Sequence, residues 1–529
     1  MKVYLYGMKP KLKKTGIILL ILIVVVIVIT IISNLVIKNK IENALADLPD
    51  SIKVTYTDIE VSIWSGSVNL NSPKISVKGE TTNKNIIQVD LKSLEVKDLG
   101  YWDYLMNDEI SIDAIIVNEM VAKYQYNPKV EKESYNSNTV ENLKKSINVK
   151  NIKINNSNIL VSDFKTDSTL LSIPTWSFEL SGFNINSKVK SKEMPFAYKS
   201  FNLNGKDLKW AMNEYENIFA NSIEVTENNI HINTFELKTK YGKRELSSIL
   251  EVERDHFDVE IMDLKLNAMD FGFKAEKQFY FNSDTMILNQ PIAEIYRDKL
   301  VADDTTSKPL YGKMLRELNF DLSIKKVEIN NGKLTYSEKV KAERQAGTLV
   351  FDDFNATLKN LGNTYGNENL TIDVTSNFME HSPLKVDWSF NVEDESDRFV
   401  FKADLDLFEA EYINQFTKPN LNADMSGELL QTYFTIGGNP ETSRIDLKVK
   451  YDNFKVNVLQ DDGKEKNSFL SVLVNLFVSK DSDDEKNNFR YGQAEGVERD
   501  DTKSVFNFVW LSIKQGLLSA MTGDGEKEN

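Results

Sequence analysis

The chain has 529 residues, a formal net charge of −15 and no cysteine. An acidic chain without a basic stripe argues against nucleic-acid binding, because phosphate backbones are held by clustered Lys and Arg. The lack of cysteine excludes a disulfide framework, a thiolate nucleophile and a Cys-ligated metal site. With 11 prolines and 23 glycines, the composition is that of a folded chain and not of a linker.

The stretch Gly16–Ile37 has no charged residue and is almost wholly Ile, Leu and Val. As a helix, it would extend about 33 Å, enough to cross a hydrocarbon core of about 30 Å. The residues before it carry lysines and no acid, so the long C-terminal part is expected to be translocated. These lysines are Lys2, Lys9, Lys11, Lys13 and Lys14.

A cleaved signal peptide is the alternative, because Ala44-Leu45-Ala46 resembles a small-residue cleavage site. The apolar run is longer than a usual signal core, and Lys38, Lys40 and Glu42 separate it from these alanines. An uncleaved, single-pass anchor is therefore the preferred prediction.

Beyond Ile52 the dominant pattern is an alternation of apolar and polar residues, which predicts strands with one apolar face. One example is Leu384, Val386, Trp388, Phe390 and Val392. The spacers are short and rich in Asn, Asp, Gly and Ser, as in Asn155-Asn156-Ser157, Asn330-Asn331-Gly332 and Asp452-Asn453. Such residues favour close turns, so the pattern predicts a long antiparallel meander of hairpins.

The hairpin pattern repeats along the chain. Ile110–Val121 aligns with Ile147–Ile159 and again with Leu322–Leu334, and Ser222–Ile232 is a looser copy. In each, the order is strand, polar turn, strand. Repeated units of this kind extend a sheet in one dimension.

Short helices are expected to interrupt the strands at 207–220, 289–300 and 409–416. The second, with Pro291 in its first turn, places a module boundary near residue 305. The predicted organisation is a basic tail over 1–15, a membrane span over 16–37, β modules over 38–305 and 306–463, and a C-terminal amphipathic segment over 464–529.

Within that last segment, Ser468–Ser479 is apolar but too short to span a membrane. An apolar stripe at helical spacing follows, and it predicts an amphipathic helix between about 504 and 521. The helix could cap the open end of the sheet, or contact a membrane or a partner protein. The stripe consists of Phe506, Val509, Trp510, Ile513 and Leu517.

Catalytic and cofactor signals are missing. The three histidines, His231, His256 and His381, have no metal-ligand spacing, and there is no phosphate-binding glycine loop or Gly-x-Ser-x-Gly elbow. The acids alternate along strands or form solvated runs such as Asp481–Glu485. The sequence predicts no enzyme, no metal and no cofactor.

A long sheet with one apolar face needs a cover, and the expected helices are too few to provide it. The sheet can close on itself as a sandwich or barrel. Alternatively, it can form an open groove whose apolar lining is covered by acyl chains. The abundance of Ile, Leu, Val and Phe fits either arrangement.

The order of these features resembles the AsmA-like family of Gram-negative envelope proteins, which includes AsmA, TamB and YhdP. The resemblance is carried by the apolar segment Ile17–Ile37, the strand pattern Val54–Val61, the repeats Val149–Val161 and Ile324–Tyr336, and the terminal segment Lys503–Met521. It covers nearly the whole chain as a pattern, without an invariant motif.

The resemblance implies a bacterial inner-membrane protein whose body lies in the periplasm as a taco-like β-sheet. The hydrophobic groove of that sheet would shield phospholipid acyl chains during transfer between inner and outer membranes. It implies no catalytic residue, and it allows an outer-membrane or envelope protein as a partner at the C-terminal end. Candidate lining residues are alternate positions of the repeats: Ile152, Ile154, Ile159, Val161, Ile324, Val327, Ile329 and Leu334.

Two other functions remain open. One is an anchored, non-enzymatic scaffold for envelope assembly, with a closed and self-filled β core. The other is a carbohydrate-active or adhesive ectodomain, which exposed aromatic platforms would favour.

Overall fold

The computed structural model describes residues 42, 45, 48, 50–62, 64–79, 84–100, 103, 109–127, 146–186, 196–274, 278–459 and 489–522. The predicted basic tail, the predicted span at 16–37 and the apolar run Ser468–Ser479 lie outside these residues. Among the described residues, no helix has both the length and the apolar character needed to cross a membrane.

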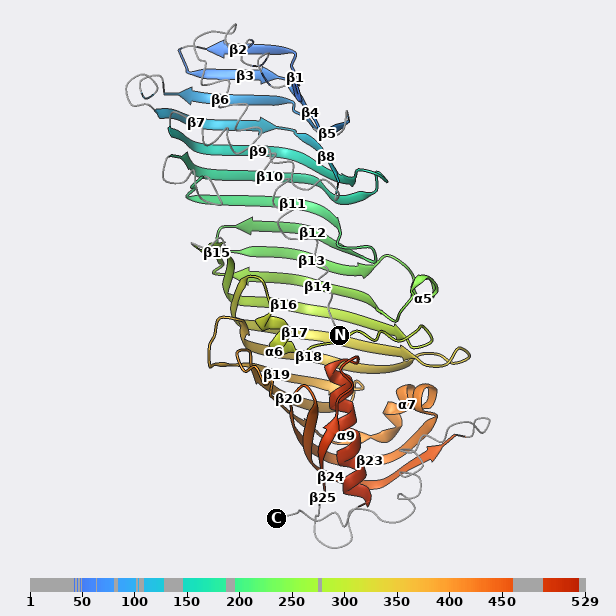
Figure 1. The fold of residues 1–529 in the computed structure, drawn as a ribbon. Helices are drawn as coiled ribbons and strands as arrows, with labels where there is room; N and C mark the ends of the chain where they lie inside the picture. Colours follow the sequence, from blue (N-terminus) through green and yellow to red (C-terminus); the bar gives the residue numbers. More distant parts are fainter. Residues whose placement is uncertain are drawn as a thin grey trace. The chain divides into compact units, whose positions relative to one another are not determined.

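The protein is mostly β, as predicted, and its described residues form 25 strands of a large, non-closed sheet (Figure 1). The chain divides into two compact units, Tyr6–Phe235 and Glu236–Asn529, which are treated separately below. The module boundary expected near residue 305 falls inside the second unit and stays a prediction.

The first unit begins with short strands joined in pairs by bends. The strands of this unit are β1 (Ile52–Thr55), β2 (Asp58–Ser62), β3 (Ser67–Asn71), β4 (Lys74–Lys78), β5 (Asn85–Asp90), β6 (Ser93–Leu99), β7 (Glu109–Asn118), β8 (Val121–Tyr126), β9 (Ser146–Asp163), β10 (Thr169–Ile185), β11 (Ser200–Ala211) and β12 (Glu216–Thr226). Strand β13 (Ile230–Thr239) runs across the division between the units.

The long strand β9 organises the first unit. Its two halves pair in parallel with β7 and β8, and its other edge pairs antiparallel with β10. The parallel register sets Ile110 beside Ile147 and Val117 beside Ile154, the same alignment that the sequence repeat predicts. The prediction of a purely antiparallel meander was wrong here. Residues at equivalent positions of the two repeats therefore lie side by side on β7 and β9. One such pair is Asn155 and Asn118, in which Asn155 Nδ2 donates to Asn118 Oδ1 at 2.9 Å.

Most of the polar spacers are bends within a strand, and the predicted hairpins at these spacers were wrong. Strand β9 continues through Asn155-Asn156-Ser157, with Asn156 at φ 47°. Asn331 and Asn453 have the same left-handed backbone within their strands. A residue in this conformation turns the chain locally, and the ladders on both sides then keep the strand from reversing. The spacer Asn228-Asn229, in contrast, forms a turn closed by Thr226 N–H to Asn229 O.

The second unit contains the remaining strands and the helices with described bounds. The strands are β14 (Asp255–Asn267), β15 (Asp270–Phe273), β16 (Phe279–Asp298), β17 (Asp321–Lys339), β18 (Gly347–Gly362), β19 (Asn369–Phe378), β20 (Ser382–Asn391), β21 (Phe399–Leu405), β22 (Phe408–Glu409), β23 (Ala423–Gly438), β24 (Thr442–Val458) and β25 (Arg490–Glu498). The helices are α5 (Lys243–Ile249), α6 (Tyr311–Arg316), η1 (Ala410–Ile413), α7 (Asn414–Leu421) and α9 (Val505–Thr522).

The helix predicted at 289–300 was wrong, because these residues belong to β16. Gln290 takes a left-handed backbone at φ 50°, and the strand continues on both sides of it. β16 pairs with β14 and, in parallel, with β17. Pairing at both edges overrides the local pattern. Because β16 and β17 are parallel, the segment 299–320 must carry the chain back to the starting end of the sheet.

The helix predicted at 207–220 was also wrong: this stretch is the end of β11, a turn and the start of β12. Asn213 Oδ1 accepts hydrogen bonds from the backbone N–H groups of Tyr215 and Glu216 at 2.7 and 2.8 Å, which fixes the turn. The helices predicted near 409–416 and 504–521 are confirmed by η1 with α7 and by α9.

Position 427 of β23 requires glycine because of its backbone conformation. We expect Gly427→Ala to destabilise the second unit by about 2 kcal/mol or more. Its φ is 85°, and an added Cβ would collide with the carbonyl group of Asn453 on β24. Gly437 of the same strand has open space around it, so Gly437→Ala should change stability by less than about 0.5 kcal/mol. Hydrogen exchange of the β23 and β24 amides would measure the loss of stability in each variant. Equal protection in the two variants would contradict the prediction.

Candidate functional site

One face of the sheet in the second unit carries an unbroken series of apolar side chains, here called the apolar face. In β14 and β16, Leu264 lies opposite Leu288 and Phe257 opposite Ile295. The series continues through β17 and β18, where Leu334 lies opposite Phe351. It reaches β24 through the cross-strand pairs Ile372–Trp388, Trp388–Phe401, Phe401–Ile436 and Ile436–Ile445.

The first part of this face, on β14, β16 and β17, is covered unevenly: Ile261 and Leu264 of β14 are buried, whereas other apolar residues of these strands are only half covered. Phe257, Leu288, Ile295 and Leu334 are half-buried and belong to none of the buried clusters of described residues. In a sheet, each side chain is shielded laterally by its cross-strand and same-strand neighbours. A half-buried aliphatic residue in the middle of a sheet therefore still presents its upper surface. No described helix packs extensively on β14 or β16.

The opposite face of these strands is polar and charged. Lys265 and Asp263 of β14 form an ion pair at 2.8 Å, and Lys326 of β17 pairs with Glu328. Ile292 is an exception, since it is 51% exposed and lies opposite Lys333, out of phase with Ala293 and Ile295.

In the first unit, the equivalent positions are covered by the chain itself. The predicted lining residues Ile152, Ile154 and Ile159 are buried members of a large core cluster, and Val161 packs against that cluster. They face Leu180, Phe178, Ile173 and Leu171 of β10. The alternation located one apolar face correctly, but it could not distinguish a filled core from an open lining.

The predicted lining residues of the second unit differ from one another. Ile324 and Val327 are buried, whereas Ile329 and Leu334 are half-buried. All four lie on β17, and Val327 and Ile329 face Leu358 and Ala356 of β18. Of the eight predicted residues, Ile329 and Leu334 thus lie on the least covered part of the apolar face.

The far part of the apolar face is covered by α9, which packs most closely on β24 and β25 and reaches Trp388 of β20 and Phe399 of β21 with its first turn (Figure 1). Phe508 and Val509 are buried there, and the Phe508 ring lies 6.2 Å from the ring of Phe399. Ser512 Oγ lies 2.7 Å from Ser443 Oγ of β24. Helix α9 therefore caps the sheet, one of the two roles that its sequence allowed.

The predicted contact stripe of α9 is divided by this packing. Val509 faces the sheet, and Ile513 and Leu517 pack partly against the same cluster. Phe506 and Trp510 are 57% and 40% exposed, although the Phe506 ring approaches Trp388 at 6.1 Å. Whether these two residues contact a membrane or a partner stays a prediction.

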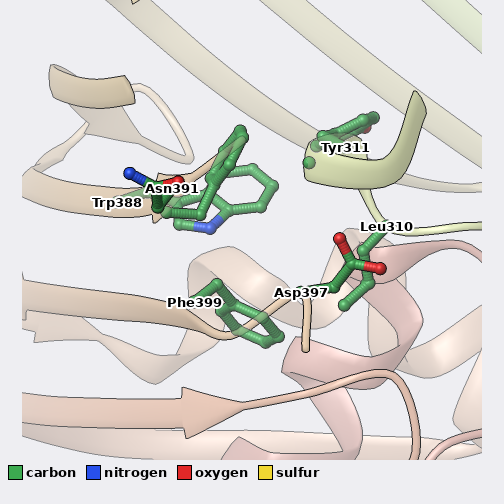
Figure 2. A pocket seen from close by; sticks show the side chains of 8 residues that line it. Leu310, Tyr311, Trp388, Asn391, Asp397 and Phe399 are labelled. Carbon is green, nitrogen blue, oxygen red and sulfur yellow. The ribbon is translucent and has the colours of Figure 1, made fainter. Parts of the chain in front are cut away.

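A second cover comes from the segment between β16 and β17. Figure 2 shows how Leu310 and Tyr311 of this segment face Trp388 and Phe399 of the sheet across a small cavity. The cavity has a volume of about 10 Å³, which leaves room for one water molecule at most. The rings of Tyr311 and Trp388 are 5.4 Å apart. The sequence had no signal for this cover, because it depends on the parallel pairing of β16 and β17.

Helix α6 is anchored beside that cavity by an ion pair. Arg316 Nη2 donates to Asp397 Oδ1 at 2.9 Å, and Arg316 Nη1 donates to the carbonyl of Val392 at 2.6 Å. Asp397 is buried. Because a buried carboxylate needs a partner, this pair determines where α6 lies on the sheet.

A larger charged cluster joins the segment after β16 to the residues before α9. The carboxylate of Glu253 is fully buried and lies 2.7 Å from Lys299 Nζ, 3.8 Å from Arg297 Nη1 and 3.6 Å from Lys503 Nζ. Lys503 also pairs with Asp303 at 3.0 Å, and its hydrogen bond lowers the pKa of Asp303. Burial lowers the pKa of Lys503, but Asp303 and Glu253 outweigh this effect and raise it overall.

Other chemistry is sparse. No group of three His, Asp or Glu in the described part of the chain is arranged to hold a metal ion. His256 Nε2 lies 3.0 Å from the carbonyl of Tyr241, and burial lowers the pKa of His256. His381 stacks on Tyr412. A wide pocket of about 570 Å³, with a lining that mixes polar residues such as Arg344 and Lys418 with apolar ones such as Leu459, includes no residue of β14 or β16.

Comparison with known proteins adds no relative: no protein-family model matches the sequence, and no curated protein is significantly similar to it.

We expect Arg316→Met to destabilise the second unit by about 2 kcal/mol or more, because it leaves Asp397 buried without its cation. Arg398 pairs with Asp394 but is 75% exposed, so Arg398→Met should cost less than about 0.5 kcal/mol. Urea unfolding followed by tryptophan fluorescence would compare the two. Equal midpoints would show that the buried pair does not hold α6.

Proposed function

We propose that this protein holds hydrocarbon chains of lipids against the apolar face of its second unit and assists phospholipid transfer between membranes. The observation that carries the proposal is the half-covered series on β14, β16 and β17, with a charged face behind it. In water such a surface is unfavourable by about 25 cal/mol per Å² of exposed apolar area. Surfaces of this kind mark binding sites for apolar ligands or partners.

The shape of the pattern favours chains over compact ligands. Paired apolar residues follow one another across successive strands, and neighbouring strands lie about 4.8 Å apart. An acyl chain laid across the strands would meet an apolar side chain at each step. Each methylene that leaves water gains about 0.8 kcal/mol, as it does in a bilayer. Transfer along the face would thus need no catalytic group, and its direction would come from elsewhere.

The location is proposed from the sequence. The apolar segment 16–37, with the lysines before it, would anchor the chain in an inner membrane and place its body in the periplasm. The order of anchor, repeated strands and terminal helix resembles the AsmA-like family, which supports a groove of the same kind. An envelope protein near α9 would then be a partner at the far end.

A second candidate function is an anchored scaffold for envelope assembly. The first unit favours it, since the apolar side chains of β3 to β10 form a filled core. A filled core of this kind offers no binding surface for a hydrocarbon chain. The two functions are compatible if the first unit is structural and the second carries the lipid.

Photocrosslinking in membranes would test the proposal. A benzophenone side chain at Leu288, Ile295 or Leu334 should capture phospholipid, because these positions lie on the half-covered apolar face. At Ile292, which is apolar and exposed but on the opposite face, it should not. Equal capture at Ile292 and Leu288, or none at the three apolar-face positions, would contradict the lipid function and favour the scaffold.

A further inference from the structure

The residues before α9 form a second attachment, made of ion pairs and hydrogen bonds, that the proposed function does not use. Lys308 N–H donates to the carbonyl of Asp501 at 2.6 Å, and Arg499 Nη2 donates to the carbonyl of Lys308. Lys503 pairs with Glu253 and Asp303. We call these contacts the ionic lock. They fix the segment 499–503 to the connection that follows β16 and to Glu253, which precedes β14.

The ionic lock is a poor source of folding stability, because it buries the charge of Glu253. Both oxygens of Glu253 are buried, and neither makes a hydrogen bond of good geometry within the described residues, although Lys299 is near. A buried ion cluster is commonly no more stabilising than apolar side chains of similar volume. Its advantage lies in defining one arrangement, and here the arrangement is the position of α9.

Helix α9 covers side chains that continue the proposed lipid site. Trp388, Phe401, Ile436 and Ile445 lie on the same face and in the same cross-strand series as Leu288 and Leu334, and they are buried in the cluster that includes Phe508 and Val509. The helix also carries apolar residues away from the sheet, Phe506 and Trp510. Packing on the sheet therefore buries only part of the apolar surface of α9.

We propose that α9 is an internal competitor for the hydrocarbon chain, held on the apolar face by its packing on β24 and β25 together with the ionic lock. A chain on β20 to β24 and α9 on the same strands exclude each other, so release of α9 would lengthen the binding face. Because exclusion is reciprocal, any change that weakens the lock strengthens chain binding. This inference rests on the proposed function for the nature of the ligand.

The test uses the full chain, its Lys503→Gln variant and an Arg444→Gln control. Arg444 pairs with Asp446 and Glu495 near α9 but is 54% exposed and outside the lock. Without ligand, Lys503→Gln should speed hydrogen exchange in α9 and leave β14 to β17 unchanged, whereas Arg444→Gln should change neither. Unchanged exchange in α9, or an equal rise over the whole unit, would overturn the lock.

A covalent closure separates the lock from the lipid function. The chain has no native cysteine, and Ser443 Oγ and Ser512 Oγ are 2.7 Å apart, so Ser443→Cys with Ser512→Cys should form one disulfide between β24 and α9. Dansyl-undecanoic acid serves as the hydrocarbon probe. Lys503→Gln should raise its affinity by about 5- to 150-fold, and oxidation of the double-cysteine form carrying Lys503→Gln should reverse the gain. Equal affinity in the oxidised and reduced forms would overturn the competition. No binding in any form would overturn the proposed function itself, while the exchange result would still decide the lock.

Discussion

The structure depends on one constraint: an apolar sheet face must be covered by something other than water. Backbone ladders build long bent strands, and alternation along them places Ile, Leu, Val and Phe on a single face. In the first unit this face is filled by the chain itself, around Ile152 and Leu180. In the second unit the cover is uneven, and the proposed function is based on that unevenness.

Two covers of different kinds meet on the far part of the second unit. Helix α9 contributes apolar packing through Phe508 and Val509, and the segment after β16 contributes Leu310 and Tyr311. Each cover is also held by an ion pair. Arg316 with Asp397 holds the segment after β16, and Lys503 with Glu253 holds the residues before α9. Apolar packing supplies most of the stabilisation, whereas the ion pairs select where each cover lies. No such cover lies on the half-buried residues Leu288 and Ile295 of β16, and the site for an external chain is proposed there.

Bends within strands replace the hairpins that the polar spacers suggested. Asn156, Asn331 and Asn453 have left-handed backbones while the strands run on through them. Asn and Asp favour this backbone in a hairpin turn and in a bulge alike. The difference is made by the neighbouring strands, which hydrogen-bond on both sides of the bend. The hydrogen bond between Asn155 and Asn118 joins the bend of β9 to the end of the neighbouring strand β7.

The sequence by itself determined that the protein is mostly β, which residues alternate, that Ile110 matches Ile147, and that 504–521 is an amphipathic helix. These features depend on local periodicity and on chemical identity. Only the tertiary structure decided that β7 pairs in parallel with β9 and β16 with β17, that 289–300 is a strand, and that Ile152 is buried while Leu334 is half covered. The same alternation serves a filled core and an open face, because it records which side of a strand is apolar and not what lies above that side.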